Sequence, residues 1–118
     1  MKYQITSDNI QISPSMEMLT KEKFSRIENR IKDVPAKSKS ARVVLNLASE
    51  EGKFTVKTVL KVDGKEYFSE DTNFSLESSI INTVEEIFRI LEKDRGKKES
   101  VREKKWKKIR EAKRSPKE

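Results

Sequence analysis

The chain has 118 residues, of which 33% are hydrophobic and 40% charged, and its net charge is +7. It contains neither cysteine nor histidine, which excludes disulfides, thiolate zinc sites and every catalytic triad that needs histidine, and which suits a reducing cytosol. The first residues form no apolar block typical of a secretory signal, and no run approaches the ~18 apolar residues of a membrane span, so we expect a cytoplasmic protein.

The first part of the chain combines a strand pattern with a helix pattern. Residues 2–7 (KYQITS) alternate between apolar and polar side chains, which predicts a short strand. Ser13-Pro14 is typical of a helix start, because serine caps the free N–H groups and proline suits the first helical position. Apolar residues then recur at helical spacing and predict a helix that ends near Pro35: Met16, Leu19, Phe24, Ile27 and Ile31.

Three further strands are predicted at residues 41–48, 53–62 and 65–71. The last two flank Asp63-Gly64, a strong hairpin signal. Each strand alternates, so one face of the sheet is expected to be buried. The candidates for that face are Tyr3, Ile5, Val43, Leu45, Leu47, Phe54, Val56, Leu60 and Tyr67.

A second helix is predicted from Leu76 to about Arg95, with Gly96 as its expected end. The order of elements is then β-α-β-β-β-α. One sheet with one apolar face and two helices to cover it gives a two-layer α+β fold with a four-stranded sheet. We therefore expect one domain over residues 1–95 and a separate extension over residues 96–118.

No pattern in the sequence favours catalysis. Adjacent acidic pairs such as Glu50-Glu51 and Glu85-Glu86 point apart on a strand or helix and are expected to be solvated surface charge. The glycines at 52, 64 and 96 are explained by turns and a helix end, and none belongs to a phosphate-binding loop. We expect no catalytic residue, no metal site, no cofactor and no small-molecule substrate, and conclude that the protein is not an enzyme.

The first predicted helix carries a row of cations. Spacings of three and four place Lys23, Arg26 and Arg30 together beside the apolar stripe, with no acid in their own stripe to neutralise them. They are either solvated side chains that cover the edge of the core or contacts for the phosphates of a nucleic acid. The residues alone leave both interpretations open.

The extension carries the whole net charge. Residues 1–95 hold 16 Lys/Arg and 16 Asp/Glu, whereas residues 96–118 hold 11 Lys/Arg and 4 Glu. Such a segment is a disordered solubilising tail, a nucleic-acid-binding arm in which cations meet phosphates and tryptophan stacks on a base, or a membrane-surface helix. The arm is favoured, and its candidate contacts are Lys97, Lys98, Arg102, Lys104, Lys105, Trp106, Lys107, Lys108 and Arg110.

Several segments resemble the ribosome hibernation promoting factor family, also called ribosome-associated inhibitor or protein Y. "YQIT", "IQISP" and "KFSRIE" (23–28) are similar to the family's first strand, helix entry and helix core. "SEDTNFSLESSIIN" (69–82) is similar to its entry into the last helix. Each motif is weak alone, but their order and spacing over residues 1–95 are specific. The chain resembles a short form that lacks the second, dimerising domain of long members.

The resemblance implies a fold like that of double-stranded-RNA-binding domains. It implies binding to the small ribosomal subunit, at 16S-type rRNA and nearby ribosomal proteins, in the messenger and transfer RNA region. Translation would be blocked by steric exclusion during stress or stationary phase, by a protein that is monomeric when free. Lys23, Arg26 and Arg30 fall where family members place cations on the first helix, which favours the phosphate interpretation.

The second helix departs from the family pattern. Thr83 and Glu86 stand where the family commonly has Lys and Arg, so Arg89, Lys93 and Arg95 would have to serve as rRNA contacts. Ser7-Asp8 replaces the family's Gly-Arg step. We expect the cationic extension to replace the lost contacts. The alternatives are a general RNA-binding or RNA-chaperone module, and a regulator whose tail docks on an acidic protein.

Overall fold

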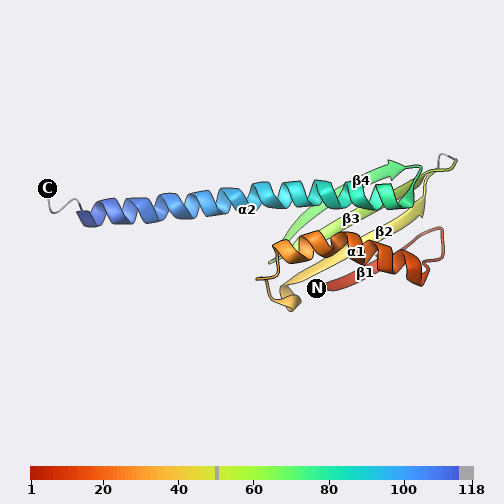
Figure 1. Ribbon diagram of the computed structural model, residues 1–118, viewed down its shortest axis with the longest axis horizontal. Coiled ribbons are helices and arrows are strands. Elements are labelled where there is room, and N and C mark those ends of the chain that lie inside the picture. Colours follow the sequence, from red (N-terminus) through yellow and green to blue (C-terminus); the bar gives the residue numbers. More distant parts are fainter. Residues whose placement is uncertain (50, 115–118) are drawn as a thin grey trace. The chain divides into compact units, whose positions relative to one another are not determined.

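The computed structural model describes residues 1–49 and 51–114, with side chains described as far as Gly96. The elements are β1 (Lys2–Thr6), α1 (Pro14–Arg30), a short 3-10 turn η1 (Ala36–Ser38), β2 (Lys39–Leu47), β3 (Phe54–Val62), β4 (Lys65–Asn73) and α2 (Leu76–Arg114) (Figure 1). This order confirms the predicted β-α-β-β-β-α fold. The chain divides into two compact units, Met1–Phe88 and Arg89–Glu118, and α2 belongs to both.

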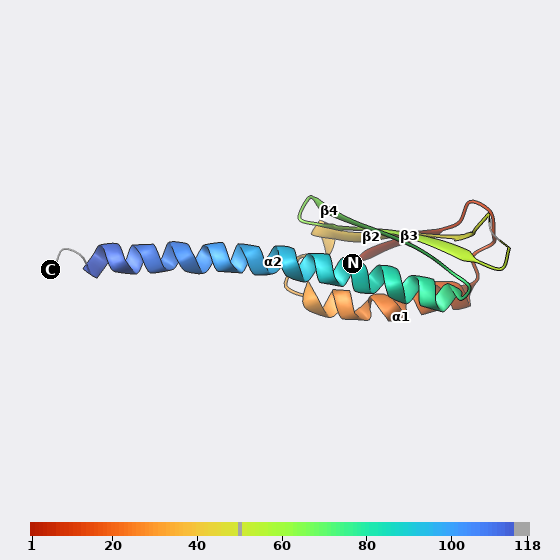
Figure 2. The same ribbon diagram turned by 90° about the horizontal axis from the view of Figure 1, so that it is seen from above.

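The four strands form one mixed sheet in the order β1-β2-β3-β4. β1 runs parallel to β2, and the other neighbours are antiparallel. Within the first unit both helices lie on the same side of the sheet (Figure 2). The fold is therefore a two-layer α+β arrangement with one covered face, as the sequence predicts.

The core lies between that face and the helices. Val43, Leu45, Val56, Leu60 and Tyr67 are buried, and from the helices Phe24, Ile27, Ile31, Ile80, Val84 and Ile87 are buried as well. Tyr3, Ile5 and Phe54 are only half-buried. Leu47 was predicted to be buried but is 46% exposed. It is the last residue of β2, so the alternation continues past the edge of the covered area.

Two local predictions are confirmed in detail. The Ser13 hydroxyl accepts the Met16 N–H at 3.2 Å, and Pro14 is the first residue of α1. At the β3–β4 turn Asp63 and Gly64 have φ angles of 50° and 80°, the left-handed backbone that a two-residue hairpin needs.

The loop after β1 is fixed by the side chain of Asn46 near the end of β2. Its Oδ1 accepts the Ser7 hydroxyl at 3.0 Å and the Asp8 N–H at 2.8 Å, while its Nδ2 donates to Asp8 Oδ2 at 3.0 Å. Asn9 adds a pair of bonds with the Leu47 backbone, each of 2.9 Å. The Ser7-Asp8 step therefore has a structural function in this chain.

The predicted end of the second helix at Gly96 is wrong, because α2 continues without a break to Arg114. Glycine costs a helix interior only about 1 kcal/mol relative to alanine. The residues after it are mostly Lys, Glu and Arg, which favour helix, and Glu103 and Lys107 stand at the stabilising i, i+4 spacing. Local propensity therefore outweighs the single glycine.

Candidate nucleic-acid interface

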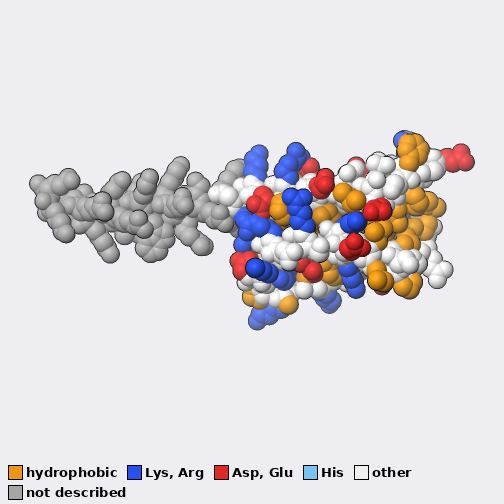
Figure 3. Space-filling model, viewed as in Figure 1, with side chains coloured by type: hydrophobic (Ala, Val, Ile, Leu, Met, Phe, Trp, Pro, Cys, Tyr) orange, Lys and Arg blue, Asp and Glu red, His pale blue; other side chains and the backbone are white. Residues whose placement is uncertain are grey.

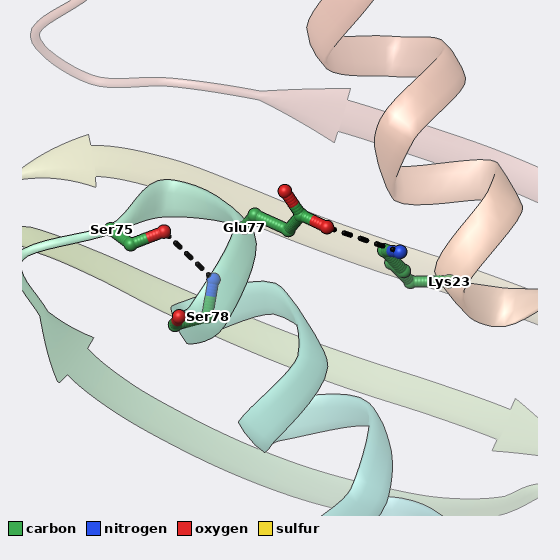
Figure 4. A network of polar contacts seen from close by, with 4 residues as sticks. All are labelled: Lys23, Ser75, Glu77 and Ser78. Carbon is green, nitrogen blue, oxygen red and sulfur yellow. Dashed lines mark hydrogen bonds and ion pairs between the residues drawn. The ribbon is translucent and has the colours of Figure 1, made fainter.

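The interface predicted on α1 is shaped by the start of α2. The Ser75 hydroxyl accepts the Ser78 N–H at 3.2 Å and its carbonyl accepts the Ser79 N–H at 3.0 Å, so Ser75 caps the helix. Glu77 lies in the first turn, where a carboxylate is stabilised by the helix dipole. The cap therefore fixes the position of this carboxylate beside α1 (Figure 4).

Lys23 is paired with Glu77. Its Nζ lies 3.3 Å from Glu77 Oε1, with side chains 25% and 55% exposed (Figure 4). An ion pair this exposed stabilises the fold by only about 0–1 kcal/mol. The acid that meets Lys23 therefore comes from the other helix, which the prediction from the α1 stripe alone did not consider.

Arg26 is held by an aromatic ring. Its Cζ lies 3.9 Å from the centroid of the Phe88 ring, the stacked geometry that a planar guanidinium prefers. The side chain is still exposed. Stacking restricts the rotamers of Arg26 and leaves the edge of its guanidinium available, so less entropy is lost when the N–H groups meet a phosphate.

Arg30 completes the row as the last residue of α1. It is half-buried and has an interaction partner of its own. The three predicted cations thus come together on one side of α1, each held by a neighbour. In the view of Figure 3, Lys and Arg side chains over the helices are interspersed with Asp and Glu.

Thr83 belongs to the core. It is fully buried, accepts the Thr58 hydroxyl at 3.1 Å and donates to the Ile80 carbonyl at 2.9 Å. A cation at this position would be buried against the sheet. The threonine therefore does not deprive the surface of an rRNA contact. Glu86 is half-buried and has a partner.

The remaining predicted contacts lie in the second unit. Arg89 and Lys93 are exposed and Arg95 is half-buried; Arg89 and Arg95 each have a partner. The side chains of Lys97, Lys98, Arg102, Lys104, Lys105, Trp106, Lys107, Lys108 and Arg110 lie outside the described residues. Their backbone is helical.

Sequence reasoning missed Glu77 and Phe88, the two α2 residues that orient the row. Their spacing of eleven residues places them on one side of a helix. Nothing in the local sequence shows that this side meets α1.

Among the described residues no helix is long and apolar enough to cross a bilayer.

The structure is thus a small α+β domain with a row of three oriented cations on α1. Residues 3–99 match the family described as Sigma 54 modulation protein / S30EA ribosomal protein. The chain belongs to this family of ribosome-associated proteins, which is not a class of enzymes, and the resemblance seen in the sequence is confirmed.

Two solved structures share the fold. The N-terminal domain of protein Y from Thermus thermophilus is 24% identical with a TM-score of 0.60, over 71% of this chain and 86% of that chain. A ribosomal subunit interface protein from Coxiella burnetii is 17% identical with a TM-score of 0.65, over 81% of this chain and 99% of that chain. No curated protein matches the chain.

Proposed function

We propose that the chain is a cytoplasmic ribosome hibernation factor. It binds the small ribosomal subunit where messenger and transfer RNA bind, and it blocks translation by occupying that space during stress or stationary phase. The family match over residues 3–99 carries this proposal. The name of the Coxiella burnetii neighbour, a subunit interface protein, supports the same location.

The α1 row supplies the rRNA contacts of the domain. Arg26, already stacked on Phe88, presents its N–H groups to a phosphate. Lys23 exchanges the Glu77 carboxylate for a phosphate oxygen, at small cost because the existing pair is solvated. A surface of pre-oriented cations suits a rigid, folded RNA, which is recognised by shape and by its phosphates.

The extension adds an electrostatic anchor. Residues 96–118 carry 11 Lys/Arg against 4 Glu, while residues 1–95 are neutral. If the α1 row and the extension together neutralise about six phosphates, log affinity falls with log salt at a slope of roughly −4 to −5. The free protein is expected to be a monomer.

A general RNA-binding module is the alternative, and the charge of the extension favours it, because phosphate contacts carry no sequence information. Competition separates the two functions. A hibernation factor stays on purified small subunits when naked rRNA is added in excess, whereas a general RNA binder transfers to the free RNA. A partner that is protein would give complexes that resist nuclease.

Co-sedimentation of the full chain with purified small subunits over a salt series tests the proposal. We expect near-stoichiometric retention at low salt. Lys104, Lys105, Lys107 and Lys108 changed together to Gln should flatten the salt slope by roughly 3, because four phosphate contacts are lost. No retention at low salt would contradict ribosome binding, and an unchanged slope would contradict the anchoring function of the extension.

A further inference from the structure

The face of the sheet opposite the helices is not covered within residues 1–88 (Figure 2). We name it the open face. One row across it joins Gln4, Arg42, Val59 and Phe68, which are cross-strand neighbours on β1 to β4. The next row runs from Lys2 through Ser40 to Lys61 and ends at Glu66 on β4. The open face therefore combines cations with an apolar floor.

Phe68 is the large apolar side chain of this face. It is 56% exposed and lies beside the half-buried Val59 on the neighbouring strand. An aromatic ring on an open four-stranded sheet is a surface on which an unpaired base can stack. Arg42 lies two strands away, about 10 Å at the usual spacing of strands, within reach of the backbone of a nucleotide whose base meets the ring.

The cations line two adjoining hollows. A hollow of about 410 Å³ is lined by Lys2, Arg42, Val59, Lys61 and one acid, Glu66, among others. It shares Lys2 and Lys61 with an adjoining hollow of about 630 Å³ at the end of the sheet, to which Lys37 and Lys39 contribute. Across the two hollows five Lys or Arg side chains stand against two acids, Asp63 and Glu66, and this excess of positive charge suits a chain of phosphates.

Within the described residues the cations of the open face, Lys2, Arg42, Lys57 and Lys61, form no ion pair. The acids on this face are Glu66 and Glu70 on the edge strand β4, which lie opposite Lys61 and Lys57 in the register. The α1 row differs, because its cations are already engaged. Cations that form no ion pair, beside an exposed ring, suit a flexible ligand.

We propose that the open face binds single-stranded RNA, with a base on Phe68 and the phosphates on Arg42, Lys61 and Lys2. This site is separate from the α1 row and does not depend on ribosome binding. Charge argues against the chain's own extension as occupant, because both are cationic. A second copy of the chain would place like charges against each other as well.

Fluorescence anisotropy with a labelled oligouridylate of about 12 nucleotides, within the usual range of site sizes, tests the proposal on the full chain. The sheet variant is Arg42→Gln with Lys61→Gln. The matched control is Lys21→Gln with Lys32→Gln, two exposed cations outside the row, one on α1 and one in the turn after it, which lowers the net charge equally. We expect the sheet variant to bind about tenfold more weakly than the control. Equal affinities would overturn the proposal.

Stacking has its own readout. Phe68→Ala should weaken oligouridylate binding about tenfold, the loss expected for one stacked base. Phe68→Trp, combined with Trp106→Phe to remove the natural tryptophan, places a single fluorophore on the open face. We expect oligouridylate to quench it. Unchanged emission at saturating RNA, or a concentration-dependent dimer of the free chain that Phe68→Ala abolishes, would overturn the proposal.

Discussion

The two sides of the sheet differ in the contacts that their cationic side chains make. On the helix side Lys23 is paired with Glu77 and Arg26 is stacked on Phe88. On the open face Arg42 and Lys61 form no ion pair among the described residues, although Glu66 lies opposite Lys61 in the register. Oriented cations lose little entropy on binding a rigid RNA, whereas cations that are not held by an ion pair, around an exposed ring, can follow a flexible strand. The same sheet thus presents two kinds of surface.

The largest effect on the free energy of unfolding is expected from substitutions that compare the packing on the two faces of the sheet. Ile27 of α1 is fully buried on the covered side of the sheet, whereas Phe68 is 56% exposed on the open face. We expect Ile27→Ala to lower the free energy of unfolding by about 2–5 kcal/mol. Phe68→Ala should lower it by less than about 1 kcal/mol. Urea denaturation of both variants measures the difference, and similar losses would mean that the open face is packed after all.

The next effect concerns the Asn46 side chain, which ties the loop before α1 to β2. Asn46→Ala removes the bonds to Ser7 and Asp8. Since these bonds are partly exposed, we expect a loss of about 1–2 kcal/mol in the free energy of unfolding. Thr55→Ala is the control, because its hydroxyl bonds only to that of Thr72 on the surface. If the two variants unfold at the same urea concentration, the network does not stabilise the loop.

A smaller effect tests the orientation of the α1 row. Glu77→Gln removes the carboxylate that engages Lys23 and that would repel an approaching phosphate. We expect affinity for small subunits to rise about twofold to fivefold. Glu85→Gln, an exposed change on the same helix, is the matched control. Weaker binding by Glu77→Gln would show that the ion pair holds Lys23 in its binding position.

The smallest effect is expected at Tyr3, on the covered side of the edge strand β1. Among the described residues its hydroxyl is buried without a hydrogen-bond partner. Burial raises its pKa above the usual 10.0, and the Glu28 carboxylate acts in the same direction. Tyr3→Phe keeps the edge-on contact with Phe24, so stability at neutral pH should be unchanged or higher by less than about 1 kcal/mol.

The same variant has a pH signature. A raised pKa in the folded state contributes stability that is complete below pH 10.0, the unfolded value, and is lost as pH rises further. Thermal unfolding above that pH should therefore affect the natural chain more than Tyr3→Phe. Parallel curves would contradict the perturbed pKa.

Local patterns predicted most of the fold. Alternation identified the strands, and the caps at Ser13 and Asp63-Gly64 act within a few residues, so the sequence displays them. The prediction that α2 ends at Gly96 was wrong because the stop signal of one glycine competes with the helix propensity of the residues after it. The prediction that Leu47 is buried was wrong because alternation along a strand does not show where the helices stop covering the sheet.

The sequence predicted the row of cations on α1 but not the side chains that hold them. Helical spacing brought Lys23, Arg26 and Arg30 together, because this depends on one element. Glu77 and Phe88 reach them only through the packing of α2 against α1, which no spacing in the sequence reveals. The open face was missed for the same reason, since Arg42, Val59 and Phe68 lie on different strands and are brought into one row only by the register.

Co-sedimentation of full-chain variants with purified small subunits tests the central claim most directly. The helix-row variant is Lys23→Gln with Arg26→Gln. It is compared with the sheet variant (Arg42→Gln with Lys61→Gln) and with the matched control (Lys21→Gln with Lys32→Gln). Each lowers the net charge equally. We predict a loss of about tenfold for the helix-row variant and near-normal binding for the other two. Equal losses in all three, or retention of the helix-row variant at full affinity, would contradict ribosome binding through the α1 row.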